Sequence, residues 1–295
     1  MKNICALVTV YKPNIKTLKK NIEIMLQYSS SIYLLYNSSI IPELQFDVRI
    51  VVIDNKRNIG ISRAINKGIN LAVKDGYKYA ILFDQDSILP KENFERLFSE
   101  ICYEEKTEKI ACIGPSLNVR NNKIPIYNWI RNKKFVQSKE VVSVDNIITS
   151  GMLINIQSFL DINGFNENFP VDFCDFIFCW KALYNGYSVL QSRNVYINHE
   201  VGNHGMKILG RTIHFHAPYR NYFLVRDTLN ICFRVEETPL RIRFHYFFFL
   251  PFRMFLFLFL LDNKKLRLRM YWMGFIDFLM SKKHFGSIAN ILNAE

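Results

Sequence analysis

Apolar residues in the first hundred positions follow two alternating patterns, short continuous runs and longer stretches with helical spacing. The short runs predict buried strands at residues 4–11, 32–39, 48–55 and 79–83. The stretches between them place apolar residues three or four positions apart and predict helices within 13–26, 61–73 and 94–101. Strands that alternate with helices indicate an α/β fold, with a mostly parallel sheet and helices on both of its faces.

Polar turns follow three of the predicted strands: "YNSS" at 36–39, "DNKRNIG" at 54–60 and "DQDS" at 84–87. Ligands of such sheets bind beyond the carboxyl ends of the strands, so these turns predict a ligand site at one edge. Gly60 permits a close approach of the backbone to a ligand, and the helix that follows can direct its N-terminus at a diphosphate. Without the neighbouring motifs, an ordinary strand-to-helix turn would be the simpler interpretation.

The turn after the fourth strand holds two carboxylates, Asp84 and Asp86, on either side of Gln85. Alternate residues at a strand end can direct both carboxylates to one site, and oxygen ligands suit Mg²⁺ or Mn²⁺. A cation held by one or two carboxylates completes its shell with substrate phosphates and water. The alternative is a solvated turn that binds nothing.

Beyond residue 110 the pattern is less regular, although residues 146–156 predict one more buried strand. The composition changes near residue 239, where the chain becomes rich in aromatic and basic residues. Residues 241–295 contain nine Lys and Arg against three Asp and Glu, a balance of 9 − 3 = +6. We therefore expect one domain over residues 1–235 and a helical region over 236–295.

The aromatic region contains an apolar stretch, residues 244–261, that would span roughly 27 Å as a helix, close to the thickness of a bilayer core. Pro251 and Arg253 lie in its middle, where a charge inside a bilayer is costly, and basic residues flank both ends. We expect a helix or a bent hairpin lying on the cytoplasmic face of the inner (plasma) membrane, followed by an amphipathic helix. The alternatives are a buried helical subdomain and a homodimer interface.

The formal charge of +12 over 295 residues indicates a polyanionic partner. The sequence has no Gly/Arg tract, zinc-finger spacing or RNP-like motif, so we expect no nucleic-acid partner. A phosphorylated substrate and an anionic membrane surface are the partners that the charge favours. The six cysteines show no regular framework and indicate reduced thiols in a cytoplasmic protein.

Six segments carry a resemblance to a known family: "LVTVYKP", "NIGISRAINKGI", "YAILFDQDS", "NIITSGMLI", "GFNENFPVDFCDF" and "HAPYRNYFLVRD". In this order, over roughly residues 4–230, they resemble the inverting GT-A glycosyltransferases of the large type-2 family, and within it the bacterial dTDP-rhamnosyltransferases. The resemblance implies a Rossmann-like GT-A domain with a nucleotide-sugar half near 1–110 and an acceptor half near 111–235. It implies transfer of rhamnose from dTDP-rhamnose to a lipid-linked glycan for a bacterial surface polysaccharide.

The resemblance also implies which residues form the site. Mg²⁺ or Mn²⁺ would bind Asp86 with Asp84, and His199 would be a further metal or diphosphate ligand. Arg220 and Arg226 are candidates for contacting the diphosphate, because a guanidinium suits bidentate contacts with phosphate. The alternative for either residue is a surface cation. The implied nucleotide-sugar site comprises Thr9, Tyr11, Tyr36, Asn37, Asn58, Gly60, Asn66, Asp84, Gln85 and Arg220.

The catalytic base implied by the resemblance is Asp175, in "FPVDFCDF", which would deprotonate the acceptor hydroxyl. Asp172 would support it, since residues three apart share a side if this stretch is helical. Alternatively, both carboxylates only stabilise the N-terminus of a helix through its dipole.

The sequence departs from the family at Tyr36, where the family usually has an Asp that reads the base ring. Base contact would then run through Asn37 or a stacked Tyr36. A UDP-sugar transferase of the same fold therefore remains an alternative, and an inactive nucleotide-binding or membrane scaffold protein is another. The intact Asp84, Asp86 and Asp175 argue against the inactive protein.

Overall fold

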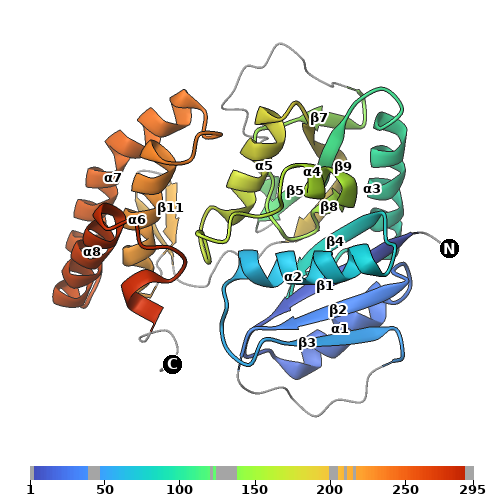
Figure 1. Cartoon of the computed structure of the whole chain (residues 1–295), viewed down its shortest axis with the longest axis horizontal. Helices are drawn as coiled ribbons and strands as arrows, with labels where there is room; N and C mark the ends of the chain where they lie inside the picture. The colour runs from blue at the N-terminus through green and yellow to red at the C-terminus, as the bar shows by residue number, and fades with distance from the viewer. Residues whose placement is uncertain are drawn as a thin grey trace. The chain divides into compact units, whose positions relative to one another are not determined.

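The computed structural model describes residues 3–38, 47–119, 122–123, 138–198, 205–208, 211–214 and 217–289. The chain forms two compact units (Figure 1). The first comprises Met1–Glu167 and Cys174–His199, and the second comprises Asn168–Phe173 and Glu200–Glu295. We describe each unit by itself.

The first four strands of the first unit form the parallel half of its sheet, as the apolar runs predicted. They are β1 (Ile4–Val10), β2 (Ser31–Tyr36), β3 (Ile50–Asp54) and β4 (Tyr79–Asp84). β1 pairs with β2 on one side and β4 on the other, and β2 pairs with β3. The register sets Thr9 of β1 opposite Asp84 of β4, so the polar ends of these strands share one edge.

The other strands extend this sheet with mixed directions. They are β5 (Ile110–Val119), β6 (Asn122–Lys123), β7 (Val141–Ser143), β8 (Leu153–Asn155) and β9 (Ser188–Asn198). In the described part of the chain the strand order is β3-β2-β1-β4-β8-β5-β9-β7, with β6 on β5. β8 pairs antiparallel with β4 and β5, which joins the two halves of the sheet.

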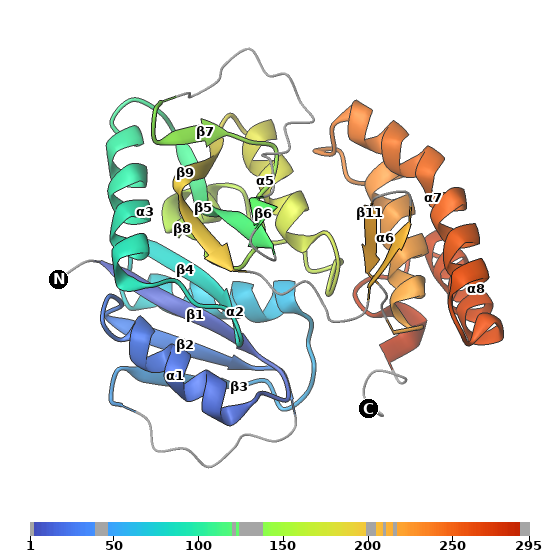
Figure 2. The same cartoon turned by 180° about the vertical axis from the view of Figure 1, so that it is seen from behind.

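Helices cover both faces of this sheet (Figures 1 and 2). Apolar residues of α1 (Ile15–Met25) and α3 (Lys91–Glu104) pack on one face. Those of α2 (Ile61–Lys74), α4 (Ile156–Asp161) and α5 (Cys174–Tyr184) pack on the other. The α/β class predicted from the alternating spacing is therefore confirmed.

Residues 146–156 do not form the single strand that their apolar character predicts. A turn occupies residues 149–151, where Gly151 has a φ of +80° and the Met152 N–H donates to the Thr149 carbonyl at 3.0 Å. Only Leu153–Asn155 is a strand. The left-handed backbone at Gly151 ends the extended run and leaves Ser150 beside β4, where its hydroxyl contacts Ser87 and Asp84.

The described part of the second unit contains three longer helices and a short hairpin. The helices are α6 (Arg220–Phe233), α7 (Leu240–Leu260) and α8 (Lys264–Leu279), followed by the 3₁₀ turn η1 (Gly286–Ile288). The hairpin pairs β10 (Gly205–Ile208) with β11 (Arg211–His214). α8 crosses α6 closely at Gly274, where a Cβ atom would lie 2.5 Å from the Tyr222 carbonyl oxygen.

One expectation about the C-terminal part differs from the structure. The division between the units leaves α6 in the second unit, although the expected domain boundary lay after residue 235. For residues 244–261 a helix or a bent hairpin was expected, and the helix is present: α7 is continuous and includes Pro251. The chain turns after α7, at Asn263, which has a φ of +59°.

Candidate functional site

The carboxyl end of β4 carries the two carboxylates of the predicted metal motif. Asp84 is the last residue of β4 and is half-buried, whereas Asp86 in the following turn is exposed. The Ser150 hydroxyl donates a hydrogen bond to the Asp84 carboxylate, and Ser87 contacts Ser150 at 3.4 Å between their hydroxyl oxygens. This contact fixes the orientation of Asp84, while Asp86 faces solvent.

Gln85, between these carboxylates, ties the turn to neighbouring elements. The Tyr11 backbone N–H donates to Gln85 Oε1 at 2.8 Å, and the Asn21 amide donates to the Gln85 carbonyl at 3.2 Å. The Thr9 hydroxyl donates to the Phe83 carbonyl at 3.4 Å. Thr9, Tyr11 and Gln85 were all expected to bind the nucleotide, and they lie together at this edge. Their hydrogen bonds stabilise the turn that carries Asp84 and Asp86.

The end of β2 holds Tyr36 and Asn37, the residues expected to contact the base ring. Tyr36 is fully buried in the core, and burial raises the pKa of its hydroxyl. This burial speaks against a nucleotide base stacked on Tyr36. The Asn37 amide donates to the Gly60 carbonyl at 3.3 Å, and its oxygen accepts from the Asn55 amide at 3.0 Å, so Asn37 holds the β2 and β3 turns together.

The N-terminus of α2 is organised by its own polar residues. Asn58 Oδ1 accepts a hydrogen bond from the Gly60 N–H at 2.9 Å, and Gly60 adopts a φ of +77°, which a glycine reaches without strain. Asn66, one turn into the helix, donates to the Phe165 carbonyl at 2.9 Å and accepts from the Phe165 N–H at 2.9 Å. Asn66 thus fixes the loop before Glu167, a role that the sequence pattern did not indicate.

Asp175 lies in the first turn of α5 and is half-buried. Its Oδ1 accepts a hydrogen bond from the Phe176 N–H at 2.9 Å. Cys179, one turn further along α5, donates from its Sγ to the Ile147 carbonyl at 3.9 Å. Because Ser150 contacts Asp84, the segment 147–150 contacts both α5 and the metal motif.

Asp172 does not share a helical face with Asp175, which corrects the expectation from sequence. α5 begins at Cys174, and Phe173 before it adopts a φ of +64°, so the chain changes direction between the two carboxylates. The Arg220 guanidinium donates to the Asp172 carboxylate in an ion pair within the second unit. The two residues expected to support the base and to contact the diphosphate are therefore partners of each other.

The second unit also contains a buried ion pair formed by Arg226, which was expected to be a diphosphate contact or a surface cation. Arg226 and Asp227 of α6 are fully buried, and their side chains are in contact at 2.6 Å. Arg226 also donates to the Asn168 carbonyl at 3.0 Å and to the His284 carbonyl. The sequence shows that Arg226 and Asp227 are neighbours of opposite charge. It does not show that they are buried, because their burial depends on packing between distant segments.

The donor set at β4 suits a hard divalent cation. Two carboxylates supply oxygen ligands, and Mg²⁺ commonly binds through one or two carboxylates together with phosphates and water. No group of three His, Cys, Asp or Glu that could hold a metal occurs among the residues that the structure describes. His199, the predicted further ligand, lies outside those residues. Asp84 and Asp86 therefore fit a cation that a diphosphate helps to hold.

Known proteins are similar to this chain in sequence. Residues 36–161 match the model of glycosyl transferase family 2. The chain is 27% identical over 249 residues to the dTDP-rhamnosyl transferase RfbF of Shigella flexneri, which covers 81% of this chain and 82% of that protein.

Solved structures share the fold at low sequence identity. The chain matches S. aureus TarS 1-349 in complex with UDP-GlcNAc with a TM-score of 0.56 and 13% identity, over 95% of this chain and 81% of that one. It matches GalNAc-T7 with UDP, GalNAc and Mn²⁺ with a TM-score of 0.53 and 11% identity, over 94% of this chain and 56% of that one. These structures support the fold, and the family 2 match and the sequence relative support the activity. The chain is a glycosyltransferase with a GT-A fold; its residues 36–161 match the family 2 model, and it is similar in sequence to a dTDP-rhamnosyl transferase.

Proposed function

We propose that this protein transfers rhamnose from dTDP-rhamnose, with inversion and with the help of a divalent metal ion. One observation carries the proposal: Asp84, oriented by Ser150, and the exposed Asp86 occupy the carboxyl end of β4, at the ligand-binding edge of the sheet. The sequence similarity to a dTDP-rhamnosyl transferase supports the choice of sugar.

Asp86 is the principal metal ligand in this proposal, with Asp84 beside it and His199 as a further ligand. Bound Mg²⁺ or Mn²⁺ would neutralise the negative charge that develops on the departing diphosphate. The chain's own residues prepare the site. The bonds of Gln85 to Tyr11 and Asn21 hold the turn in place, so its carboxylates are ordered before the donor binds.

Asp175 is the base that accepts the proton of the acceptor hydroxyl as that oxygen attacks the sugar carbon. Its position in the first turn of α5 favours the ionised carboxylate, because the helix dipole stabilises negative charge there. Asp172 is already paired with Arg220 and is a weaker candidate for proton transfer. We propose a lipid-linked glycan as the acceptor, in the synthesis of a bacterial surface polysaccharide.

A UDP-sugar is the second candidate donor. Solved structures that share this fold are complexes with UDP, with UDP-GlcNAc, or with UDP, GalNAc and Mn²⁺. The buried Tyr36 removes the expected stacking contact, so no described residue at the end of β2 distinguishes thymine from uracil.

A thermal-shift panel tests the proposal. The full chain is heated with dTDP-rhamnose, UDP-sugars and GDP-sugars, each with Mn²⁺ and again with EDTA. We expect stabilisation by dTDP-rhamnose that EDTA removes, because a ligand that binds only the folded state raises its stability. Stabilisation by a UDP-sugar alone would replace the proposed donor.

The variant Asp86→Ala tests whether Asp86 binds the metal ion. We expect it to keep the melting temperature of the free protein and to lose the Mn²⁺-dependent stabilisation and donor turnover. Exposed Glu95→Ala, on α3, is the control and should keep both. A wild-type protein that neither binds nor turns over any donor would instead indicate the inactive scaffold.

A further inference from the structure

One face of α7 is an exposed stripe of large apolar residues. Phe248, Phe252 and Phe255 are 70%, 59% and 68% exposed. The stripe consists of residues three or four positions apart: Leu240, Phe244, Phe248, Phe252, Phe255 and Phe259. From Leu240 to Phe259, over 20 helical residues, this stripe extends roughly 28 Å. Soluble monomers rarely expose a continuous apolar surface of this kind, so the stripe indicates a binding surface.

The opposite side of α7 is packed inside the second unit. Ile242, Leu250 and Phe257 are buried, and the last two contact apolar residues of α6 and α8. The Tyr271 hydroxyl of α8 donates to the Met254 carbonyl at 3.3 Å, which attaches the two helices to each other. α7 is therefore held in place by its inner face, with its aromatic stripe directed away from its own unit.

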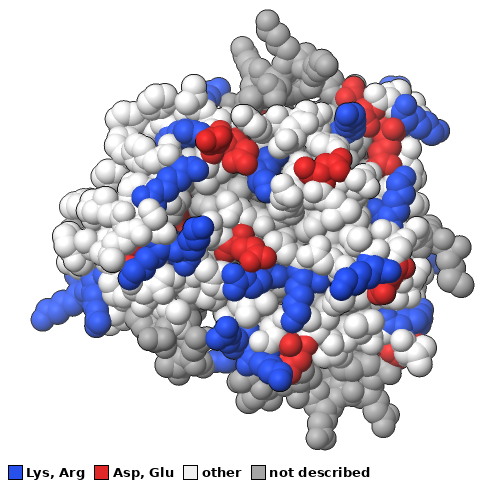
Figure 3. Space-filling view, viewed as in Figure 1, with Lys and Arg blue, Asp and Glu red and all other residues white. Residues whose placement is uncertain are grey.

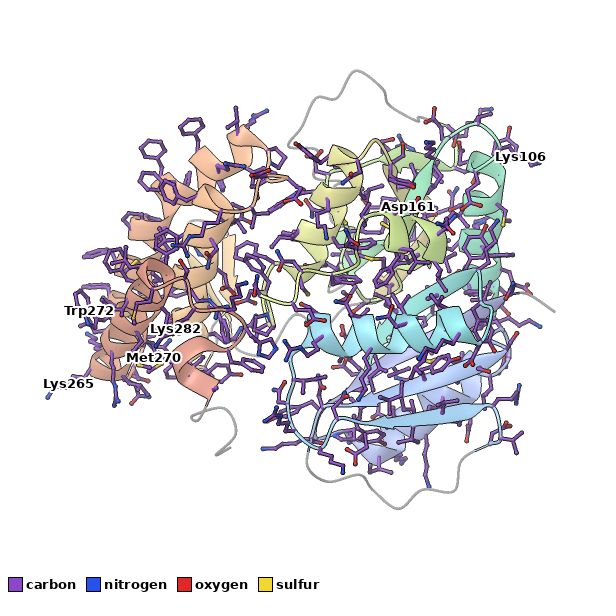
Figure 4. All side chains as sticks on the ribbon, in the orientation of Figure 1. Lys106, Asp161, Lys265, Met270, Trp272 and Lys282 are labelled. Atoms are coloured by element: carbon purple, nitrogen blue, oxygen red, sulfur yellow. The ribbon has the colours of Figure 1, made fainter. Side chains whose placement is uncertain are left out.

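α8 adds a second exposed stripe. Leu268, Trp272, Phe275 and Leu279 lie three or four residues apart, and Trp272 is 64% exposed. Figure 4 shows Trp272 and Lys265 at the outer edge of the α7–α8 pair, on the side away from α6. Tryptophan is enriched where an apolar surface meets water, because its ring is apolar and its N–H is polar.

The charge around these stripes is strongly positive. Residues 240–283 contain nine Lys and Arg against two Asp. Of the two, Asp277 is buried and bonded to Lys282 and Ser287. Lys264, Lys265 and Arg269 of α8 are exposed. Over α7 and α8, at the left of Figure 3, the surface shows wide areas without charged residues and more basic than acidic residues.

We propose that α7 and α8 bind the surface of an anionic lipid bilayer, with α7 lying along the membrane plane and its aromatic stripe in the headgroup boundary. An apolar face bordered by exposed Lys and Arg matches such a surface, because apolar burial and attraction to anionic headgroups add to each other. The inference goes beyond the proposed transfer reaction, since binding to lipid does not require turnover.

The packing of α7 favours this orientation over a crossing of the membrane. Among the described residues, α7 alone has the length and composition of a membrane span. Its inner face, however, is joined to α6, which contains the buried pair of Arg226 and Asp227, and to α8 with its exposed basic residues. A crossing would take these charged helices into the bilayer or strip α7 from its packing, and either change is costly.

Co-sedimentation of the full chain with vesicles tests the proposal. We expect binding to vesicles of phosphatidylcholine with phosphatidylglycerol, and much weaker binding to phosphatidylcholine alone. The double variant Phe248→Glu/Phe255→Glu should bind at least about tenfold more weakly, because two large apolar side chains lose their burial. Tyr103→Glu, an equally exposed aromatic position on α3, is the control and should bind like the wild type.

Charge and orientation have separate tests. Lys264→Gln/Lys265→Gln/Arg269→Gln should lose about tenfold or more of the binding to anionic vesicles, since each basic residue near the surface contributes. Single variants Phe244→Glu, Phe252→Glu and Phe259→Glu should weaken binding by similar factors if the whole stripe lies on the membrane. Much milder effects at Phe244 and Phe259 than at Phe252 would instead indicate a spanning helix, because charges near helix ends reach the interface.

Two further results would overturn the proposal. Wild-type protein that stays in the supernatant with anionic vesicles contradicts it directly. Aromatic variants that bind lipid normally but turn a dimer into a monomer in light scattering would assign the stripe to a second copy of this chain. If a Phe→Glu variant melts at a clearly lower temperature than the wild type, the Phe→Ser variant at the same position is tested in its place. The proposal requires that this Ser variant also binds vesicles more weakly than the wild type. Asp86→Ala should bind vesicles like the wild type, so failure of the catalytic proposal remains distinguishable from failure of this one.

Discussion

At the scale of single residues, Ser150 is the clearest addition that the structure makes to the site. Its hydroxyl donates to Asp84 across 66 residues of sequence. The segment "TSG" lies inside a stretch whose apolar pattern predicts a strand, and nothing in it identifies a partner for Ser150. The positions of Asp84 and Asp86 at the end of β4 were predictable, because a continuous apolar run that ends in carboxylates marks where a buried strand stops. The hydrogen bond from Ser150 to Asp84 was not predictable, because it depends on how a distant turn packs against β4.

Removal of the Ser150 hydroxyl should weaken use of the metal. In Ser150→Ala the Asp84 carboxylate loses a partner that orients it, so we expect turnover to need about tenfold more Mn²⁺ for half-maximal activation. The measurement is a Mn²⁺ titration of dTDP release from dTDP-rhamnose. Ser99→Ala, at an exposed position on α3, should leave the titration unchanged. An unchanged Mn²⁺ requirement in Ser150→Ala would show that this hydrogen bond has no part in the site.

Glu100 is a buried carboxylate on α3 that should make stability depend on pH. Burial raises its pKa from 4.5 to about 7, with Glu140 adding repulsion and Arg96 opposing the rise. Between these values the folded protein keeps a proton that the unfolded chain has lost. The contribution of this group to stability is therefore present below about pH 4.5 and is lost as the pH rises to about 7.

Glu100→Gln removes this titration. We expect the variant to match the wild type near pH 4.5 and to exceed its free energy of unfolding by about 2 kcal/mol near pH 8. Urea denaturation at the two pH values provides the measurement. Exposed Glu95→Gln on the same helix should show no such difference. A variant that is less stable than the wild type near pH 8 would mean that Glu100 is stabilised in its charged form.

At the scale of elements, the apolar pattern predicted the strands and helices of residues 4–104 to within a few residues. Burial on both faces requires a continuous apolar run, and packing on one face requires helical spacing, so both leave a direct record in sequence. The start of α5 and the break at Gly151 left no such record. Phe173 adopts a left-handed φ although it is a bulky aromatic residue, which no propensity predicts.

Gly274 allows α8 to approach α6, and its replacement should separate the two helices. In Gly274→Ala the added Cβ would meet the Tyr222 carbonyl oxygen at 2.5 Å and the Arg226 nitrogen at 3.3 Å. We expect the free energy of unfolding to fall by about 2 kcal/mol, because backbone atoms cannot move aside as a side chain can. Urea denaturation provides the measurement, with Arg269→Ala on the exposed face of α8 as the control. Equal stability of Gly274→Ala and the wild type would contradict the close crossing.

At the scale of the whole molecule, the division into units was the least predictable feature. Residues 168–173 interrupt the first unit in sequence yet belong to the second by their contacts. Arg226 binds the Asn168 carbonyl, Arg220 binds Asp172, and Val171 packs near Tyr222. Composition marked a boundary near residue 236 because the aromatic content rises there. It could not show that α6 packs with the helices that follow it.

The central claim is that one carboxylate, Asp175, removes the proton of the attacking hydroxyl in a site organised around Asp84 and Asp86. The most direct test is release of dTDP from dTDP-rhamnose by Asp175→Asn, in samples whose donor affinity is measured by calorimetry. We predict donor binding equal to that of the wild type and a loss of turnover by a factor on the order of 10²–10⁴. Wild-type turnover by Asp175→Asn, at the same donor affinity, would contradict the account.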